Sequence, residues 1–199
     1  MRETKLFWSS PTAEKALDVA FSQGLAVLAE SDTIWGLLTP TTKAGAAELD
    51  TLKKRRDKPY LVLIGSLGLA EKLLFFPDNG SYALAQKGWP GPLTLLCPSK
   101  RGMLEDAQSP AGIVGIRVPN HEPLRNAAKK YGGLFSTSAN ISGEPVPITF
   151  DTISESIRAR VGAIIYNDPS YIPQTKPSTI VDCSGNVLKI VRQGAYNLT

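Results

Sequence analysis

One stretch of the sequence concentrates polar side chains that could bind an anion. Residues 133–143 begin apolar, as a buried strand does, and then supply a run of hydroxyl and amide groups bracketed by glycines. Such groups after the carboxyl end of a strand suit an anionic or nucleotide ligand, although an ordinary serine- and asparagine-rich turn has the same composition. The polar residues of the stretch are Ser136, Thr137, Ser138, Asn140 and Ser142.

A second cluster of chemically useful residues is basic. Five of the six residues 53–58, which precede Pro59, are lysine or arginine. Cations collect at helix C-termini because the macrodipole favours them there, so the run could simply end a helix. Five neighbouring cations also repel one another unless an anion neutralises some of them, and a polyphosphate is the simplest such anion.

Two isolated arginines need partners. Arg117 lies within an apolar run, where an unpaired charge is costly, so we expect a carboxylate or a phosphate beside it. Asp182 and Glu30 are the candidates for a structural ion pair. Arg192 ends another apolar run and has the same two interpretations, while Ser178 could belong to a turn or supply a ligand hydroxyl.

Other catalytic chemistries have few residues to work with. The chain has a single histidine, His121, and its place near Pro123 predicts a surface or capping role at a helix start rather than catalysis. Cys97 and Cys183 lie in separate apolar runs and are expected to be buried free thiols. Neither standard glycine-rich phosphate loop is present, and no paired carboxylates suggest a metal cage. Any Mg²⁺ is therefore expected to arrive on the phosphates of a nucleotide.

Composition predicts one ordinary globular domain over residues 1–199. The chain is 42% hydrophobic and 20% charged, with a net charge of +4 that favours anionic partners. No apolar run approaches the roughly 18 residues of a membrane span, and the first residues lack a signal-peptide core. We expect a cytoplasmic protein without membrane contact.

Hydrophobic periodicity alternates between strands and helices, which is typical of the α/β class. Residues 30–37 are expected to form a polar turn, and residues 99–112 and 168–177 to form loops, each a candidate lid. Helices are predicted at about 10–24, 43–54, 67–74, 122–131 and, capped by Asp151, 151–160. Strands are predicted at the start of 133–143 and at 25–29, 60–64, 93–97, 113–118, 163–166, 179–183 and 187–192, the last two as a hairpin.

Seven motifs, in order along nearly the whole chain, together resemble the YrdC-type threonylcarbamoyl-AMP synthases. The resemblance implies a single-domain fold in which a twisted mixed α/β sheet, flanked by helices, encloses a basic cleft. It also implies a reaction that joins L-threonine, bicarbonate and ATP into threonylcarbamoyl-AMP with release of pyrophosphate. The product feeds a tRNA modification through downstream threonylcarbamoyl-transfer proteins. The motifs are residues 31–37, 53–55, 89–94, 115–119, 136–143, 177–182 and 192–195.

The resemblance also implies roles for individual residues. Lys53 and Arg55 resemble the pair that meets the phosphates of ATP, and they are the expected catalytic residues. The other expected ATP contacts are Thr137, Ser138, Asn140, Ser142 and Arg192, and the expected threonine contacts are Thr33, Arg117 and Ser178. Attack of a carboxylated threonine on the α-phosphate needs alignment and charge neutralisation more than an acid–base residue.

The sequence departs from the family pattern in two places. The usual Pro-Thr-x-Thr-x-Tyr-Gly-Leu keeps Thr33 here but has Glu30, Ser31 and Trp35 in place of the proline, the first threonine and the tyrosine. Trp35 could reshape the threonine pocket. The basic segment is also one residue short, which leaves the pair formed by residues 54 and 56, Lys54 and Arg56, as an alternative phosphate pair.

These departures keep a second function open. The fold is associated with double-stranded RNA binding, so an RNA-binding relative without synthase activity is the alternative to the enzyme. A carbamoyl-phosphate-using maturation domain is a third interpretation, which the modest chain length disfavours.

Overall fold

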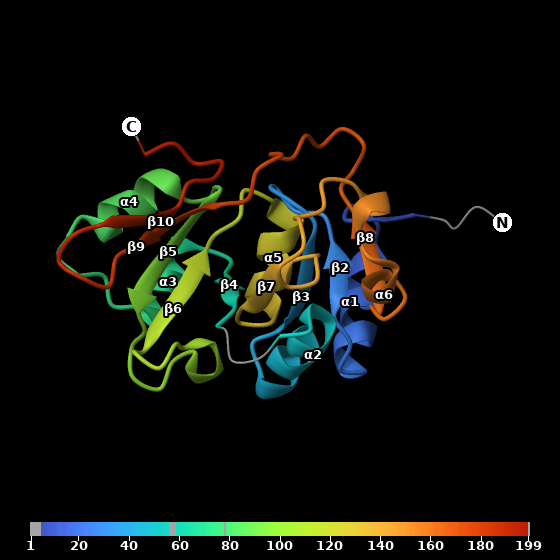
Figure 1. Cartoon of the computed structure of the whole chain (residues 1–199), viewed down its shortest axis with the longest axis horizontal. Coiled ribbons are helices and arrows are strands. Elements are labelled where there is room, and N and C mark those ends of the chain that lie inside the picture. The colour runs from blue at the N-terminus through green and yellow to red at the C-terminus, as the bar shows by residue number, and fades with distance from the viewer. Residues whose placement is uncertain (1–4, 56–58, 78, 199) are drawn as a thin grey trace.

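The computed structural model describes residues 5–55, 59–77 and 79–198. Their strands form one mixed sheet in the order β1-β8-β2-β3-β7-β4-β6-β5-β9-β10, with β8 and β10 toward opposite ends of the molecule (Figure 1). The strands are β1 (Leu6–Phe7), β2 (Val27–Ala29), β3 (Gly36–Pro40), β4 (Leu61–Leu63), β5 (Leu93–Pro98), β6 (Ile113–Arg117), β7 (Leu134–Ser138), β8 (Ala163–Tyr166), β9 (Thr179–Asp182) and β10 (Lys189–Arg192).

Helices flank this sheet, which confirms the predicted α/β class. They are α1 (Ala13–Ser22), α2 (Lys43–Lys53), α3 (Leu67–Leu73), α4 (Ser81–Gly88), α5 (Glu122–Lys130) and α6 (Glu155–Arg158), with short 3₁₀ turns η1 (Glu105–Ala107) and η2 (Phe150–Thr152). In the part of the chain that the structure describes, no helix is both long and apolar enough to cross a membrane.

The central strands are antiparallel, and their register decides where the loops emerge. β3 begins at Gly36, which is paired with Ser138 at the end of β7. β4 begins at Leu61, which is paired with Ser136. The segments before β3, before β4 and after β7 therefore leave the sheet at one edge. These segments carry four of the ten predicted site residues, and two more lie at the end of β7 beside them.

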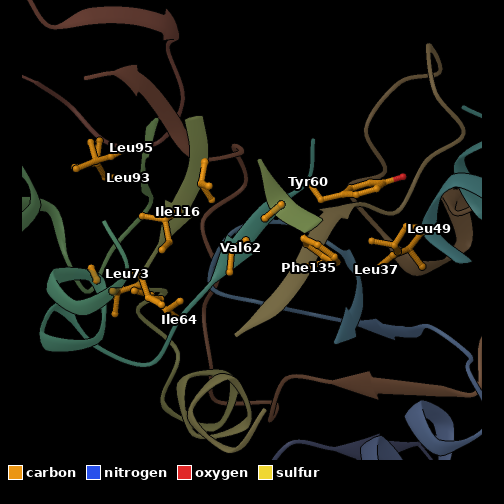
Figure 2. Packing of buried hydrophobic residues seen from close by; sticks show 14 of the residues in the cluster. Leu37, Leu49, Tyr60, Val62, Ile64, Leu73, Leu93, Leu95, Ile116 and Phe135 are labelled. Carbon is orange, nitrogen blue, oxygen red and sulfur yellow. The ribbon is translucent and has the colours of Figure 1, made fainter. Parts of the chain in front are cut away.

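Successive side chains of a strand pack in separate hydrophobic clusters on the two faces of the sheet. On β2, Val27 packs in a cluster with α1 and α5, whereas Leu28 packs in a second cluster with α2 and α3. Figure 2 shows this second cluster extending through Phe135 at the middle of the sheet. A fully buried side chain of this size contributes about 1.5–3 kcal/mol to folding. The central strands that carry the site are thus firmly held.

Local capping explains where two of the helices begin. α2 follows Thr42, whose hydroxyl accepts a hydrogen bond from the backbone N–H of Gly45 at 3.1 Å. α5 follows His121, whose Nδ1 accepts from the backbone N–H of Leu124 at 3.2 Å. The capping role predicted for His121 is confirmed, whereas the alternative of a surface position is wrong, because the residue is 3% exposed. The cysteines are also buried and free, as predicted.

Two predicted elements are wrong. Residues 30–37 are not all turn, because β3 starts at Gly36 and continues to Pro40. The helix predicted over residues 151–160 is broken into η2 and α6. Thr149, not Asp151, precedes η2, and the hydroxyl of Thr152 donates to the carbonyl of Thr149 at 2.7 Å. Such side chain–backbone bonds compete with continuous helix. β1 and α4 were not anticipated.

Candidate functional site

The predicted site residues meet in one cleft of about 370 Å³. Its walls are built by the segment before β3, the end of α2, the start of β4, the segment around the end of β7, and the ends of β6, β9 and β10 that face it. All ten residues that the sequence assigned to ATP or threonine line it, namely Thr33, Lys53, Arg55, Arg117, Thr137, Ser138, Asn140, Ser142, Ser178 and Arg192.

Lys53 ends α2 and reaches into the polar loop after β7. Its Nζ donates to the carbonyl of Ser138 at 2.7 Å and to Oδ1 of Asn140 at 2.8 Å. The residue is only 3% exposed. Burial, with a smaller contribution from the charge of Arg55, lowers the pKa of Lys53 to about 8.

Lys53 and Lys54 differ in where their side chains lie, because the helix ends between them. Lys54 adopts a left-handed conformation, with φ of 50°, and closes the helix there. Its side chain is exposed and does not line the cleft, whereas Arg55 does. Arg56, the other member of the alternative pair, lies outside the described residues. Of the three described residues in the two pairs, Lys53 and Arg55 line the cleft and Lys54 does not.

Arg55 is oriented by an aromatic ring. Its guanidinium lies 4.4 Å from the centre of the Tyr60 ring, and its Nε donates to the Tyr60 hydroxyl at 3.4 Å. That hydroxyl donates in turn to Oδ1 of Asp50 at 2.6 Å. Burial and the Asp50 bond raise the pKa of Tyr60 to about 12, so it stays protonated and keeps Arg55 in place.

The polar loop after β7 is anchored to the end of α2. Asn140 Oδ1 accepts from the Ser138 hydroxyl at 2.5 Å, and Asn140 Nδ2 donates to the carbonyl of Glu144 at 2.6 Å. The backbone N–H of Ser142 donates to the carbonyl of Lys53 at 3.0 Å. The hydroxyl and amide groups that suggested an anion site thus form one rigid unit with the lysine.

Arg117 has the carboxylate partner that its position demands, but the partner is Asp32. Its Nη2 lies 2.6 Å from Asp32 Oδ2, its Nη1 donates to the Thr33 hydroxyl at 3.1 Å, and its Nε donates to the carbonyl of Gly91 at 2.9 Å. Burial lowers the pKa of Arg117, and the charge of Asp32 opposes that shift. The guanidinium therefore holds the Thr33 side chain in place at the wall of the cleft.

Both partners proposed from the sequence are wrong for identifiable reasons. Asp182 is paired across the sheet with Leu96 and accepts from the backbone N–H of Ser184 at 2.9 Å. Glu30 accepts from the backbone N–H of Asn167 through Oε2 at 2.6 Å. Only the fold brings Asp32 to the arginine.

Ser178 and Arg192 form the far end of the cleft. The Ser178 hydroxyl is 2.8 Å from the hydroxyl of Thr94, and its carbonyl accepts from Arg192 Nη2 at 2.8 Å. Gly194 permits this contact, since a Cβ there would lie 2.2 Å from the carbonyl oxygen of Pro177. Burial lowers the pKa of Arg192.

Other lining residues were given no ligand by the sequence. Ser136, which belongs to the polar stretch, lines the cleft on the same face of β7 as Ser138. Thr94, from the motif 89–94, and Tyr60, which had no signal, also line it. Among the described residues, no group of three or more histidines, cysteines or carboxylates could hold a metal ion. Among the described residues that line the cleft, Glu30 alone has a carboxylate side chain.

Comparisons with known proteins identify the family of the chain. The Sua5/YciO/YrdC family model, described as "Telomere recombination", matches residues 19–194. A Bacillus subtilis protein named threonylcarbamoyl-AMP synthase is 30% identical over 214 residues, covering 96% of this chain and 58% of the relative. A Mycobacterium tuberculosis relative, which carries that name provisionally, is 31% identical over 179 residues, covering 88% of this chain and 81% of the relative.

Solved structures give the same assignment. A double variant of P. abyssi Sua5 has a TM-score of 0.81 at 25% identity, covering 98% of this chain and 61% of that one. P. abyssi Sua5 complexed with L-threonine has a TM-score of 0.78 at 25% identity, covering 91% and 53%. The chain thus spans less than two thirds of the B. subtilis and P. abyssi proteins. It belongs to the Sua5/YciO/YrdC family.

Proposed function

We propose that this chain is an L-threonylcarbamoyladenylate synthase, which makes threonylcarbamoyl-AMP and pyrophosphate from L-threonine, bicarbonate and ATP. The observation that carries the proposal is that residues from separate motifs, scattered between positions 33 and 192, converge on one cleft. The names of the B. subtilis relative and of the threonine-bound P. abyssi structure support it. We also propose that the chain forms a single domain, since one sheet contains strands from β1 to β10.

In this proposal the nucleotide occupies the end of the cleft built by α2 and the loop after β7. Lys53 and Arg55 supply positive charge to the phosphates, Arg192 adds a third cation, and hydroxyl and amide groups position the rest of the nucleotide. The Lys53 ammonium already donates hydrogen bonds to oxygen atoms of Ser138 and Asn140 at 2.7 and 2.8 Å. These bonds hold it in a position from which it can also donate to a phosphate oxygen. The remaining nucleotide contacts are Thr137, Ser138, Asn140 and Ser142.

The threonine end of the cleft lies beside the segment before β3. Thr33 and Ser178 offer hydroxyls there, and Arg117 supplies a positive field toward the substrate carboxylate. Its contacts to Asp32, Thr33 and Gly91 make Arg117 an anchor for this end of the cleft as well as a source of charge.

The chemistry requires alignment of two anions. The threonine amine and bicarbonate condense to a carbamate with loss of water, and a carbamate oxygen then attacks the α-phosphorus of ATP. The new oxygen–phosphorus bond forms as the bond to pyrophosphate breaks. Lys53 and Arg55 would neutralise charge on the phosphates during that step, a role in which fixed cations in a partly buried site are effective.

The remaining partners follow from the same chemistry. The described residues of the cleft offer Glu30 as a carboxylate but no set of ligands for a protein-held metal, so we assign Mg²⁺ to the nucleotide. The product is a mixed anhydride that water destroys. We therefore propose that a tRNA threonylcarbamoyl-transfer protein consumes it.

Release of pyrophosphate tests the proposal. The wild-type chain should release pyrophosphate from ATP only when L-threonine and bicarbonate are both present. Lys53→Ala and Asn140→Ala should each lose at least tenfold in rate, as expected when a charged contact or its anchor is removed. Lys54→Ala, at the exposed neighbouring lysine, is the matched control and should retain the wild-type rate.

Two outcomes would reject the proposal. Pyrophosphate release that ignores threonine or bicarbonate would indicate another reaction. A wild-type chain that releases none, yet binds double-stranded RNA with a steep salt dependence, would favour the RNA-binding alternative.

A further inference from the structure

A buried polar network lies behind the threonine end of the cleft. Asn167 directly follows β8, is 7% exposed and contacts two consecutive residues of the segment before β3. Its backbone N–H donates to Glu30 Oε2 at 2.6 Å, and its Nδ2 donates to the carbonyl of Ser31 at 2.9 Å. Its Oδ1 lies 2.9 Å from His121 Nε2. One residue therefore ties Glu30 and Ser31 to the body of the protein.

His121 fixes the orientation of that amide. Its Nδ1 accepts the capping hydrogen bond from the Leu124 N–H, so the proton of the neutral ring is on Nε2. Nε2 then donates to Asn167 Oδ1, which turns the amide nitrogen of Asn167 toward Ser31. Burial favours this neutral form by lowering the pKa of His121. The ring is also packed at 5.5 Å from Trp8 and 4.9 Å from Tyr171.

The same segment is held from other sides as well. Trp8 Nε1 donates to the carbonyl of Glu30 at 2.9 Å. Glu30 and Ser31 line both the main cleft and an adjoining pocket of about 60 Å³, which Gln174 and Thr175 help to enclose. The network thus ends on two residues that line the main cleft.

We propose that Asn167, oriented by His121, is a positioning residue that holds Glu30 and Ser31 in the shape required to bind the amino-acid substrate. This inference rests on the synthase function proposed above. Neither Asn167 nor His121 lines the main cleft, so both act through the segment before β3. The consequence is a specific loss of amino-acid binding, with the nucleotide end left intact, when the network is broken.

Substitutions in the full-length chain separate positioning from folding. Asn167→Ala removes both amide contacts, while the backbone bond to Glu30 stays possible. His121→Asn keeps an oxygen that can cap α5 but is too short to reach Asn167, so it removes the orienting bond alone. Asn126→Ala, at an exposed asparagine on α5, is the matched control.

The measurement compares the KM values for L-threonine and for ATP, together with calorimetric binding of L-threonine alone. Asn167→Ala should raise the threonine KM about tenfold, the effect of losing one or two buried hydrogen bonds. His121→Asn should raise it by a smaller factor in the same direction. The ATP KM should stay within about twofold in both, and Asn126→Ala should match wild type in every value.

Several results would overturn the inference. If wild type is active and the threonine KM of Asn167→Ala is unchanged while its melting temperature falls, the network only supports folding. Equal increases in both KM values would likewise show general disruption rather than positioning. A wild-type chain that neither releases pyrophosphate nor binds threonine would reject the proposed function itself, and this inference with it.

Discussion

The charge of Lys53 should make ATP binding depend on pH in a range where most lysines do not titrate. With a pKa of about 8, about 90% of the Lys53 side chains carry a proton at pH 7 and about 10% at pH 9. Only the protonated form attracts phosphate. Raising the pH through 8 should therefore weaken ATP binding by up to roughly ninefold, the ratio of those fractions.

Calorimetric titration with ATP at pH 7, 8 and 9 measures this loss. Lys53→Arg is the decisive control, because its guanidinium stays charged throughout and every other titrating group is unchanged. Its affinity should be nearly constant over the range, while Lys53→Met should bind weakly at each pH. Bound phosphates should also restore the proton of Lys53, so binding at pH 8 should take up about half a proton.

The same dependence of ATP binding on pH in wild type and Lys53→Arg would refute this prediction. Equal proton uptake by the two proteins at pH 8 would refute it as well. Either result would mean that Lys53 is fully charged before ATP binds.

Three further predictions concern the groups around the cleft. Asp32→Ala leaves Arg117 buried without its carboxylate and should lower the free energy of unfolding by about 3–5 kcal/mol in urea, whereas Glu14→Ala at the exposed Lys130 pair should cost less than about 1 kcal/mol. Equal losses of unfolding free energy in the two variants would refute the buried Asp32–Arg117 ion pair as a source of stability. Gly194→Ala places a Cβ 2.2 Å from the Pro177 carbonyl oxygen and should cost about 1–3 kcal/mol and weaken ATP binding, while Gly185→Ala, in open space, should do neither. Matching melting temperatures would contradict this. Finally, Cys97 is buried and its contact with Cys183 raises its pKa, so a thiol reagent should label the chain only after unfolding; rapid labelling of the native protein would be inconsistent with the packing.

Sequence periodicity predicted much of the fold because most elements are amphipathic or continuously apolar. α2 and α5 were placed within a residue or so at each end, and the hairpin of β9 and β10 was recognised. β3 was missed because Gly36, Thr39 and Pro40 leave only two consecutive apolar residues within the strand, too few to reveal it. The helix expected over residues 151–160 failed because Thr149 and Thr152 close a separate turn first.

The composition of the site was more predictable than its connections. Polar motifs identified residues that line one cleft, but not the pairs they form. The requirement that Arg117 have a partner follows from burial, while the choice of Asp32 depends on the fold, which brings the segment before β3 to the end of β6. Lys53 faces the cleft, whereas Lys54 has a left-handed backbone conformation and does not line the cleft. A lysine gives no sequence signal for that conformation. The contact of Asn167 with His121 joins residues 46 positions apart and has no local signature either.

The most direct test of the synthase function is identification of the product itself. The purified chain would be incubated with ATP, L-threonine and isotope-labelled bicarbonate, and the nucleotides analysed at once by mass spectrometry. We predict an AMP adduct that contains threonine and is heavier by the mass of the label, together with pyrophosphate. An adduct of threonine and AMP without the labelled carbon, or pyrophosphate with no adduct, would contradict the account.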